Sequence, residues 1–599
     1  MSRLSLCHPQ IPHPSLSPFS CRRRGKRTRD QGTPLLPQRS RLVGTAPLMG
    51  YFTNGLRSRD NGIPFCSLSR YVATLLRTLA AGALLGLIAC TSPTPTPSPT
   101  STPTPPAEAF QSSAVIASPA AAPHLDVHQD VSEALLSLGP GIAYSRLMRL
   151  RSGPEVTLPS MVLECDLCSR WEHSDPLTYV FPLRQGVRWQ DMPPVNGRAL
   201  TAQDVVFSLD RMRTPGWPGA ALLQGVAAIE ATDALTVTIR LKYSDADFLL
   251  ALANGQSKVV ASEAVAVKGH LREGPTIGTG PWVMKANGAE GLVLEANPLY
   301  YEPGIPGLKQ LRILPIPDQS TRLAALLIGR VDMTPVDADG RSQLQGFGAK
   351  VSLGEFPQPG TGVLLGLNTT RPPFDRVEIR QAIFHAINPW SALETVWKGQ
   401  GDVAVGVPVA STEWLLSKEE MQRYLGPTAQ PDRFVSLAKP VAFTLTVGDF
   451  GDSHLALGQE YRRMLEASGF QATVKEVNPR VYAEEVWDKG DFQAFLGPMP
   501  PVATPNAFLL GLLHSWGRWS VTGYADGELD RMIEAQSVAE QGRGELILDI
   551  QRYVLEKGIM FMPVTGTRLW AWRERVEGFA PNFAAGEYFH WARLRVKQG

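Results

Sequence analysis

The stretch Phe181-Pro182-Leu183-Arg184-Gln185-Gly186-Val187-Arg188-Trp189-Gln190-Asp191 is followed, after a short loop, by Leu200-Thr201-Ala202-Gln203-Asp204-Val205-Val206-Phe207-Ser208-Leu209. The first stretch continues an aromatic and β-branched run over residues 177–183, which predicts a strand. In the second stretch Thr201 has an acid three residues later, Asp204, as in the box that caps the start of a helix. Apolar residues then recur on one helical face. The two stretches therefore predict a strand, a loop and a capped helix, in a chain where strand and helix patterns alternate. The same alternation predicts a small α/β unit further on, with a strand over residues 441–447, a helix over 456–468 and a strand over 473–477.

Three further motif pairs follow in order along the chain. They are Gly278-Thr279-Gly280-Pro281-Trp282 with residues 295–301, residues 318–326 with 329–332, and residues 366–375 with 380–383. Together with the opening pair they resemble the motifs of the family 5 extracellular solute-binding proteins, the receptors of ABC importers for peptides, nickel and oligosaccharides. Met192 stands where the family usually has Gly. The resemblance covers nearly all of residues 124–599.

The resemblance implies a mixed α/β (α+β) fold of two lobes, with an extra subdomain in the first lobe and the ligand cleft between the lobes. The predicted parts are an N-terminal extension and signal peptide (1–89), a Thr/Pro/Ser-rich linker (90–119), lobe I (120–366), lobe II (367–560) and a returning segment of lobe I (561–599). The implied function is capture of a small solute, such as an oligopeptide, and its delivery to ABC transporter permease subunits. A monomer without a cofactor is expected. The alternatives are a receptor for sensing or a peptide chaperone, and, more distantly, an exported hydrolase.

A short apolar run, residues 79–89, lies between Arg77 and Cys90, and a Thr/Pro/Ser tract follows. A basic flank, an apolar core and a small residue before the cysteine are typical of a bacterial export signal. The run is too short for a membrane span, which needs roughly 20 apolar residues. Residues 87–90 resemble a lipobox, so Cys90 is predicted to be lipidated. The protein would then be anchored by lipid on the extracytoplasmic face of the cell membrane.

The charge distribution argues against a nucleic-acid partner. Residues 1–77 contain 13 Lys and Arg against two acids, whereas the whole chain has a net charge of +2. The remainder is therefore acidic, and an acidic surface does not suit phosphate binding. The basic residues belong to the predicted signal and to what precedes it, where translation is expected to start later than Met1.

Cys165 and Cys168 form a Cys-x-x-Cys pair in the part predicted to be exported. In an exported protein two nearby cysteines most often form a local disulfide. A thioredoxin-like redox site or a zinc site is the alternative, but no βαβ pattern surrounds the pair and no second pair supplies further ligands.

Several residues have a structural interpretation that competes with a chemical one. Gly278 and Gly280 are expected to permit a tight turn into a strand, because Pro281-Trp282 follows and no helix opens there as in a nucleotide loop. Pro372-Pro373 is expected to stiffen a crossing between the lobes. His124, Asp126 and His128 could hold a metal if they lay on one helix, but no metal site is predicted.

No catalytic residue is predicted, because the chain contains no Gly-x-Ser-x-Gly, His-Glu-x-x-His or Gly-x-x-x-x-Gly-Lys motif. The enzyme hypothesis therefore has no positive support in the sequence.

The predicted ligand loop departs from the peptide-binding members of the family. In those proteins an aspartate in a loop before a Pro-x-x-Phe helix start pairs with the α-ammonium group of the peptide. Here Pro501 occupies that position, and residues 495–508 contain no acid. The candidate ligand-contacting residues of this loop are Pro498, Met499, Pro501 and Val502. A carboxylate from elsewhere, such as Asp491 or Asp526, remains the alternative.

Two tryptophans follow the loop, in Ser515-Trp516-Gly517-Arg518-Trp519-Ser520. Trp516 and Trp519 are candidates for stacking against a sugar or an apolar side chain. Packing against the surface of the lobe is the alternative. Arg518 is a candidate partner for an anionic group of the ligand, with simple exposure to solvent as the alternative.

Overall fold

The computed structural model describes residues 110–597, apart from residues 112, 289, 347–349 and 428–439. Cys90, the predicted signal peptide and most of the predicted linker lie outside the described residues. Within the described part of the chain, each helix is too short or too polar to span a bilayer.

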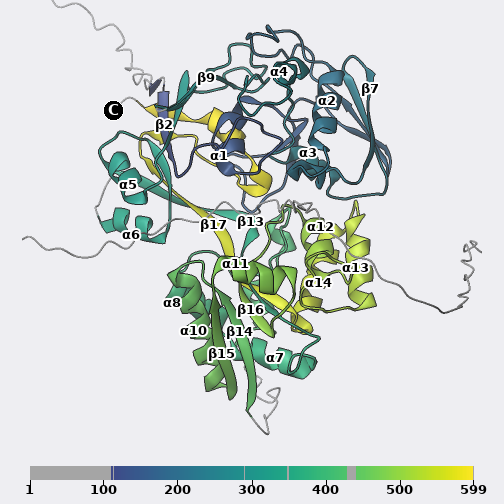
Figure 1. Cartoon of the computed structure of the whole chain (residues 1–599), viewed down its shortest axis with the longest axis vertical. Coiled ribbons are helices and arrows are strands. Elements are labelled where there is room, and N and C mark those ends of the chain that lie inside the picture. The colour runs from purple at the N-terminus through teal and green to yellow at the C-terminus, as the bar shows by residue number, and fades with distance from the viewer. Residues whose placement is uncertain (1–109, 112, 289, 347–349, 428–439, 598–599) are drawn as a thin grey trace, which may run out of the picture. The chain divides into compact units, whose positions relative to one another are not determined.

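A ten-stranded mixed sheet runs through the molecule in the order β15-β14-β16-β13-β17-β12-β2-β11-β10-β9 (Figure 1). Its strands are β2 (Ser113–Ser118), β9 (Trp282–Gly288), β10 (Gly291–Ala296), β11 (Gln310–Pro315), β12 (Met333–Val336), β13 (Val351–Leu367), β14 (Val441–Gly448), β15 (Phe470–Val477), β16 (Ala494–Pro498) and β17 (Met560–Arg573). The mixed α/β fold class predicted from the sequence is confirmed.

The long strands β13 and β17 pair antiparallel and connect the two lobes (Figure 1). The register shifts between Pro357 and Gly362, so the ladder is interrupted there. One hydrophobic core comprises residues between Val363 and Val564, which we call the core of lobe II. The remaining cores belong to lobe I and include Trp570 on the other side of the interruption. The predicted boundaries at 366/367 and 560/561 thus fall within these two strands.

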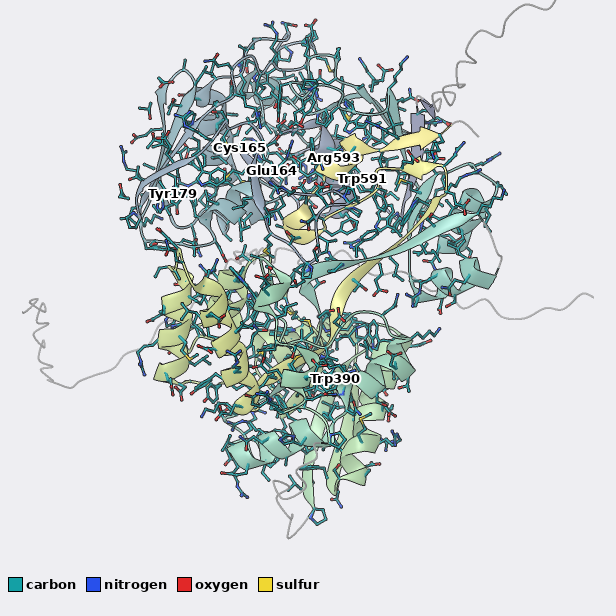
Figure 2. All side chains as sticks on the ribbon, turned by 180° about the vertical axis from the view of Figure 1, so that it is seen from behind. Glu164, Cys165, Tyr179, Trp390, Trp591 and Arg593 are labelled. Atoms are coloured by element: carbon teal, nitrogen blue, oxygen red, sulfur yellow. A yellow bond between two sulfur atoms is a disulfide. The ribbon has the colours of Figure 1, made fainter. Side chains whose placement is uncertain are left out.

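Lobe II has the local α/β unit that the pattern over 441–477 predicts. Parallel strands β14 and β15 flank α10 (Asp452–Ala467), which packs on both. The other helices are α7 (Val377–Ala386), α8 (Pro389–Trp397), α9 (Lys418–Met421), α11 (Pro479–Tyr482), α12 (Pro505–Phe508), α13 (Gly527–Ser537) and α14 (Arg543–Glu556). Figure 2 shows Trp390 of α8 in this lobe, far from Trp591 and Arg593 of lobe I.

Lobe I contains a second, four-stranded sheet in the order β5-β6-β8-β7. Its strands are β5 (Glu172–Asp175), β6 (Thr178–Pro182), β7 (Val226–Asp233) and β8 (Thr236–Leu241). The helix α2 (Ala202–Met212) packs on β7 and β8 and begins with the predicted capping box, in which the Thr201 backbone N–H donates to the Asp204 carboxylate at 2.9 Å. Further elements are α1 (Glu133–Leu136), α3 (Phe248–Ala253), α4 (Ser262–Ala266), α5 (Gln319–Leu327), α6 (Ala338–Gly346), β3 (Met148–Leu150) and β4 (Leu163–Cys165).

The beginning and the end of the described chain meet in lobe I. β1 (Phe110–Gln111) pairs antiparallel with β19 (Arg595–Lys597), which also pairs with β18 (Val576–Glu577). Lobe I therefore begins within the range assigned to the linker (90–119): the last residues of that range form β1 and β2, and β2 lies buried inside the ten-stranded sheet.

Cys165 and Cys168 are joined by a disulfide with an S–S distance of 1.98 Å and a Cα–Cα distance of 5.1 Å. Cys165 ends β4, next to the Glu164 side chain labelled in Figure 2. Cys168 belongs to the core of lobe I.

One local expectation from the sequence was wrong and another was incomplete. Residues 279–281 bend before β9, as expected, but Gly278 and Gly280 have a further role: a Cβ at these positions would lie 2.1 and 2.7 Å from the Ala143 carbonyl oxygen, so close backbone approach excludes larger residues. Pro372-Pro373 lies in lobe II beyond the end of β13, and the crossing between the lobes occurs instead along residues 357–362.

Candidate functional site

The predicted ligand loop begins where β16 ends, at the border of the two lobes. β16 pairs antiparallel with β13, and its last residue, Pro498, lies opposite Val363 at the edge of the register shift. The loop ends at Thr504, whose side chain caps α12 by accepting a hydrogen bond from the Ala507 backbone N–H at 3.3 Å. The topology therefore places residues 499–504 beside the crossing strands.

The loop is packed directly on the crossing strand β13. The Val502 backbone N–H donates to the Gly360 carbonyl oxygen at 3.2 Å. Gly360 has a φ of +81°, and a Cβ there would lie 1.6 Å from the Val502 carbonyl oxygen. Because glycine alone combines that backbone conformation with such close approach, the loop and the crossing strand are fitted to each other at this point.

The side chains of the loop differ in their access to solvent. Pro501 is exposed, and Pro498 and Val502 are half-buried, whereas Met499 is buried in lobe II. The Trp487 indole N–H donates to the Pro498 carbonyl oxygen at 3.2 Å, which fixes the start of the loop. The loop thus presents proline rings and an apolar side chain, while Met499 has a packing role.

The two alternative carboxylates are already occupied. Asp491 forms an ion pair with Arg371 at 2.8 Å, and this pair lowers the pKa of the Asp491 carboxyl. Asp526 caps α13 by accepting a hydrogen bond from the Glu528 backbone N–H at 2.7 Å, which likewise lowers its pKa. Both carboxylates therefore have structural partners within lobe II.

The two candidate tryptophans have different surroundings. Trp519 is half-buried against the core of lobe II and lies edge-on to Trp487, with ring centroids 6.4 Å apart. The Arg518 guanidinium lies 4.6 Å from the centre of the Trp519 ring. Through Trp487, Trp519 shares a neighbour with the predicted loop at Pro498.

Trp516 is 70% exposed and lies against the buried His514 ring, at a centroid distance of 4.3 Å. The segment after it is held at the far end of β13, where the Thr369 backbone N–H donates to the Thr522 carbonyl oxygen at 2.8 Å. The described contacts of Trp516 and its neighbours are thus within lobe II, and they do not join Trp516 to the predicted loop.

A polar cluster that the sequence analysis did not identify connects lobe I with the beginning of α12. Asp247 of lobe I accepts hydrogen bonds from the Asn506 backbone N–H at 2.6 Å and from Arg543 at 2.6 Å. In the sequence Asp247 precedes the apolar helix α3 and has the pattern of an ordinary cap. No local signal pairs it with Arg543, which lies 296 residues later.

The comparisons with known proteins identify the family. The sequence model of the bacterial extracellular solute-binding proteins, family 5 (middle), matches residues 163–520. The chain belongs to this family. Among curated relatives, a probable di/tripeptide-binding protein 5 of Pseudomonas aeruginosa is 26% identical over 82% of this chain and 98% of its own length.

Two other relatives have different ligands in their names. Heme-binding protein A of Haemophilus influenzae is 30% identical over 47% of this chain and 53% of its own length. The glutathione-binding protein GsiB of Escherichia coli is 25% identical over 61% of this chain and 67% of its own length.

Solved structures show the same fold. The unliganded open form of the periplasmic murein tripeptide-binding protein MppA has a TM-score of 0.69 at 18% identity, covering 82% of this chain and 98% of its own. The ABC transporter substrate-binding protein CtaP of Listeria monocytogenes has a TM-score of 0.67 at 17% identity, covering 82% of this chain and all of its own. The fold of this solute-binding protein is therefore the two-lobe fold predicted from the sequence.

The histidines near the start of this solute-binding protein contribute to folding contacts. Asp126 forms a buried ion pair with Arg211 at 2.5 Å. The ring of His128 bonds through Nε2 to the Lys258 carbonyl oxygen at 2.9 Å, and burial with the nearby Arg211 lowers the pKa of His128 to about 4. Among the described residues, no group of three or more His, Cys, Asp or Glu side chains is arranged to hold a metal ion.

Two hollows on the surface of the solute-binding protein lie apart from the predicted loop. One, of about 510 Å³, lies between α10 and β15 in lobe II, and the other, of about 540 Å³, lies beside α2 in lobe I. Neither is lined by residues of the predicted loop, and each is lined by residues of one lobe only, lobe II for the first and lobe I for the second.

Proposed function

We propose that the mature protein captures a peptide or peptide-like solute between its two lobes and delivers it to the permease subunits of an ABC importer. The family match over residues 163–520 is the observation that carries this proposal. The names of relatives, which include di/tripeptide-binding and glutathione-binding proteins, support the ligand class. The family consists of binding proteins, and we infer that this member catalyses no reaction on its ligand.

The ligand is not recognised through a free α-amino group at residues 497–504. The loop contains no carboxylate, and Asp491 and Asp526 are held by Arg371 and by the start of α13. A charge-assisted hydrogen bond to an ammonium group contributes about 1.5–3 kcal/mol, which this loop cannot supply. Its prolines lack N–H donors, and the Val502 N–H is bonded to Gly360. The loop therefore suits an uncharged or partly apolar edge of the ligand.

The candidate ligand contacts are the residues of this region whose side chains remain accessible to solvent. Pro498, Pro501 and Val502 retain accessible surface, and Trp519 with Arg518 adjoins them through Trp487. Met499 is buried in the core of lobe II, so it supports the loop by packing beneath it. Trp516 remains a candidate for stacking with a ligand on its own surface of lobe II.

We also propose that Cys90 is lipidated and that the protein works as a monomer tethered to the extracytoplasmic face of the cell membrane. The Thr/Pro/Ser tract would act as a semi-extended spacer between the lipid and lobe I. Such a spacer keeps a receptor near its permease while leaving the lobes free to move.

A thermal-shift screen with peptides, oligosaccharides and metal chelates tests the function. Binding to the folded state raises the free energy of unfolding by RT ln(1 + [L]/Kd), about 2.7 kcal/mol at a hundredfold excess over Kd. We expect peptides to stabilise the protein. A screen in which peptides fail and sugars or chelates succeed would contradict the ligand class.

Each peptide that binds is then compared with its N-acetylated form. We expect their Kd values to differ by less than tenfold, equivalent to about 1.4 kcal/mol. A larger loss on acetylation would show that an ammonium group is recognised. Trp519→Ala should weaken binding, and Trp516→Ala, with its more exposed ring, reports whether the second surface takes part. If neither substitution affects binding, the site is wrongly placed.

Import is distinguished from sensing or chaperoning by uptake. Vesicles containing the cognate permease and ATPase subunits should accumulate the bound solute only when this protein is present. Binding without uptake would favour the sensing or chaperone alternative, and conversion of the solute would favour the hydrolase.

A further inference from the structure

We propose that Asp247 is a positioning residue of lobe I that holds the end of the ligand loop and restrains the two lobes relative to each other before any ligand binds. The proposal rests on the two-lobe binding function proposed above. Its evidence is a buried polar network between residues that are far apart in the sequence and belong to different lobes.

Both oxygens of the Asp247 carboxylate are bound by lobe II. Oδ1 accepts a hydrogen bond from Arg543 Nη1 at 2.6 Å, and Oδ2 accepts one from the Asn506 backbone N–H at 2.6 Å. Asp247 is 4% exposed and Arg543 is 8% exposed. Charge-assisted hydrogen bonds that are shielded from water are among the strongest polar contacts in a protein.

The lobe II side of this contact is held in place by its own hydrogen bonds. Arg543 also donates to the Asn506 side-chain oxygen at 2.9 Å and to the Gln536 side-chain oxygen at 3.2 Å. Gln536 donates to the same Asn506 oxygen at 2.9 Å. Since these bonds lie within lobe II, Arg543 keeps its orientation even when Asp247 is removed.

Two more contacts extend the connection on the lobe I side. The Asn506 side-chain amide donates to Asp245 at 2.8 Å, and the Ala246 backbone N–H donates to the Ser537 carbonyl oxygen at 2.8 Å. The short segment 245–247 therefore contacts α12, α13 and α14, all of which belong to lobe II. This is an attachment between the lobes that is separate from the strands β13 and β17.

The position of the attachment connects it with the ligand loop. Asn506 is the second residue of α12, directly after the loop that ends at Thr504, while the other side of the loop is bonded to Gly360 in β13. The loop is thus fixed at one point to the crossing strand and at the other to Asp247 of lobe I. A pair of strands interrupted at 357–362 can bend and twist, and a further attachment outside these strands limits both motions.

The test measures distances between the lobes in the purified mature protein without ligand. Nitroxide labels are placed on cysteines introduced at two exposed positions, Glu230→Cys in lobe I and Gln471→Cys in lobe II, and the distance distribution is measured by pulsed electron resonance. We expect Asp247→Asn to broaden or shift this distribution, and Asp247→Glu, which keeps the carboxylate, to restore it in part.

A matched control separates restraint from general destabilisation. Asp126 forms an equally buried ion pair with Arg211, but both residues lie in lobe I. Asp126→Asn should lower the unfolding temperature and leave the distance distribution unchanged. If Asp247→Asn does not fold, Arg543→Lys, which keeps the charge and loses the forked geometry, replaces it with the same expected broadening.

An unchanged distribution in the folded Asp247 or Arg543 variants would overturn the proposal, as would an equal broadening in Asp126→Asn. Because no ligand is present, this outcome is independent of the thermal-shift screen. If the protein binds peptides but its lobes are unrestrained, only the role of Asp247 is refuted and the proposed function stands.

Discussion

Replacing Lys258 by Met should stabilise lobe I. The side chain is fully buried, and its ammonium nitrogen has no hydrogen-bond partner among the described residues. It lies 3.4 Å from the centre of the Tyr588 ring, beside Arg146, which is paired with Glu587 at 2.7 Å. Burial, with the nearby positive charge of Arg146, holds the pKa of Lys258 well below its ordinary value.

Two opposing free energies determine the charge of the buried Lys258 amine: its contact with the aromatic ring and its removal from water. Contact of a desolvated cation with an aromatic face contributes about 2 kcal/mol. Removing an ammonium ion from water costs several kcal/mol even after the protein relaxes, and the Glu587 carboxylate is already shared with Arg146. Folding therefore shifts Lys258 toward its neutral form. Met is similar in length and carries no polar group, so Lys258→Met should raise the free energy of unfolding by about 1–3 kcal/mol near pH 7.

The pH dependence gives a second readout with a definite sign. Lys258 in the unfolded chain binds a proton up to a pH of about 10.4, whereas the folded protein does not bind it above its lowered pKa. The unfolded state therefore binds more protons, and stability rises with pH in this interval, by up to about 1.4 kcal/mol per pH unit for one proton. Lys258→Met should remove this contribution, so its advantage over the wild type shrinks as the pH approaches 10.

The free energy of unfolding is measured in urea at pH 7, 8.5 and 10. Hydrogen exchange of the backbone amides of β3 serves as the probe, because it reports on lobe I separately from lobe II. Lys242→Met is the control, because the Lys242 ammonium lies on the surface of the same lobe, 2.8 Å from the Gln224 carbonyl oxygen. This control should change stability by less than about 0.5 kcal/mol. A Lys258→Met protein that is less stable than the wild type, with the same pH slope, would refute the reasoning and show a charged lysine held by Tyr588 and Glu587.

Three further predictions concern covalent and backbone features. Thiol counting on the denatured, non-reduced mature protein should find neither Cys165 nor Cys168 free; two reactive thiols or a bound zinc ion would contradict the disulfide. Cys90→Ala should abolish labelling of the protein by radioactive palmitate in cells, and unchanged labelling would exclude lipidation there. Gly278→Ala should destabilise lobe I by at least about 2 kcal/mol, since its Cβ would lie 2.1 Å from the Ala143 carbonyl oxygen, and a variant that melts like the wild type would show that the backbone can yield.

Local patterns were sufficient where neighbours in the sequence determine the structure. The strand β6, the capped helix α2 and the α/β unit around α10 were predicted because alternation, capping residues and helical spacing are short-range properties. The residue order of four motifs then predicted the family, and with it the two-lobe fold.

These local patterns could not predict contacts between residues that are far apart in the sequence. Asp247 has the sequence pattern of a helix cap, yet its partner Arg543 is 296 residues away. Gly280 suggested a turn because turns are the commonest reason for glycine, whereas its contact with Ala143 arises only when distant segments pack. Trp516 and Trp519 are close in sequence, but one ring lies in the exposed loop and the other against the core of lobe II.

In the sequence, the residues of the lobe II core lie between two groups of residues that share one core of lobe I. This order has a consequence for folding during synthesis on the ribosome. Among the described residues, the core of lobe II draws only on those between Val363 and Val564, so it can form as soon as that continuous segment has emerged from the ribosome. One core of lobe I combines Ala114 and Ile116 with Trp570 and Trp591, which lie more than 450 positions later in the sequence. Ala114 and Ile116 therefore keep apolar surface exposed to solvent until residues 570–591 have been synthesised and can pack against them.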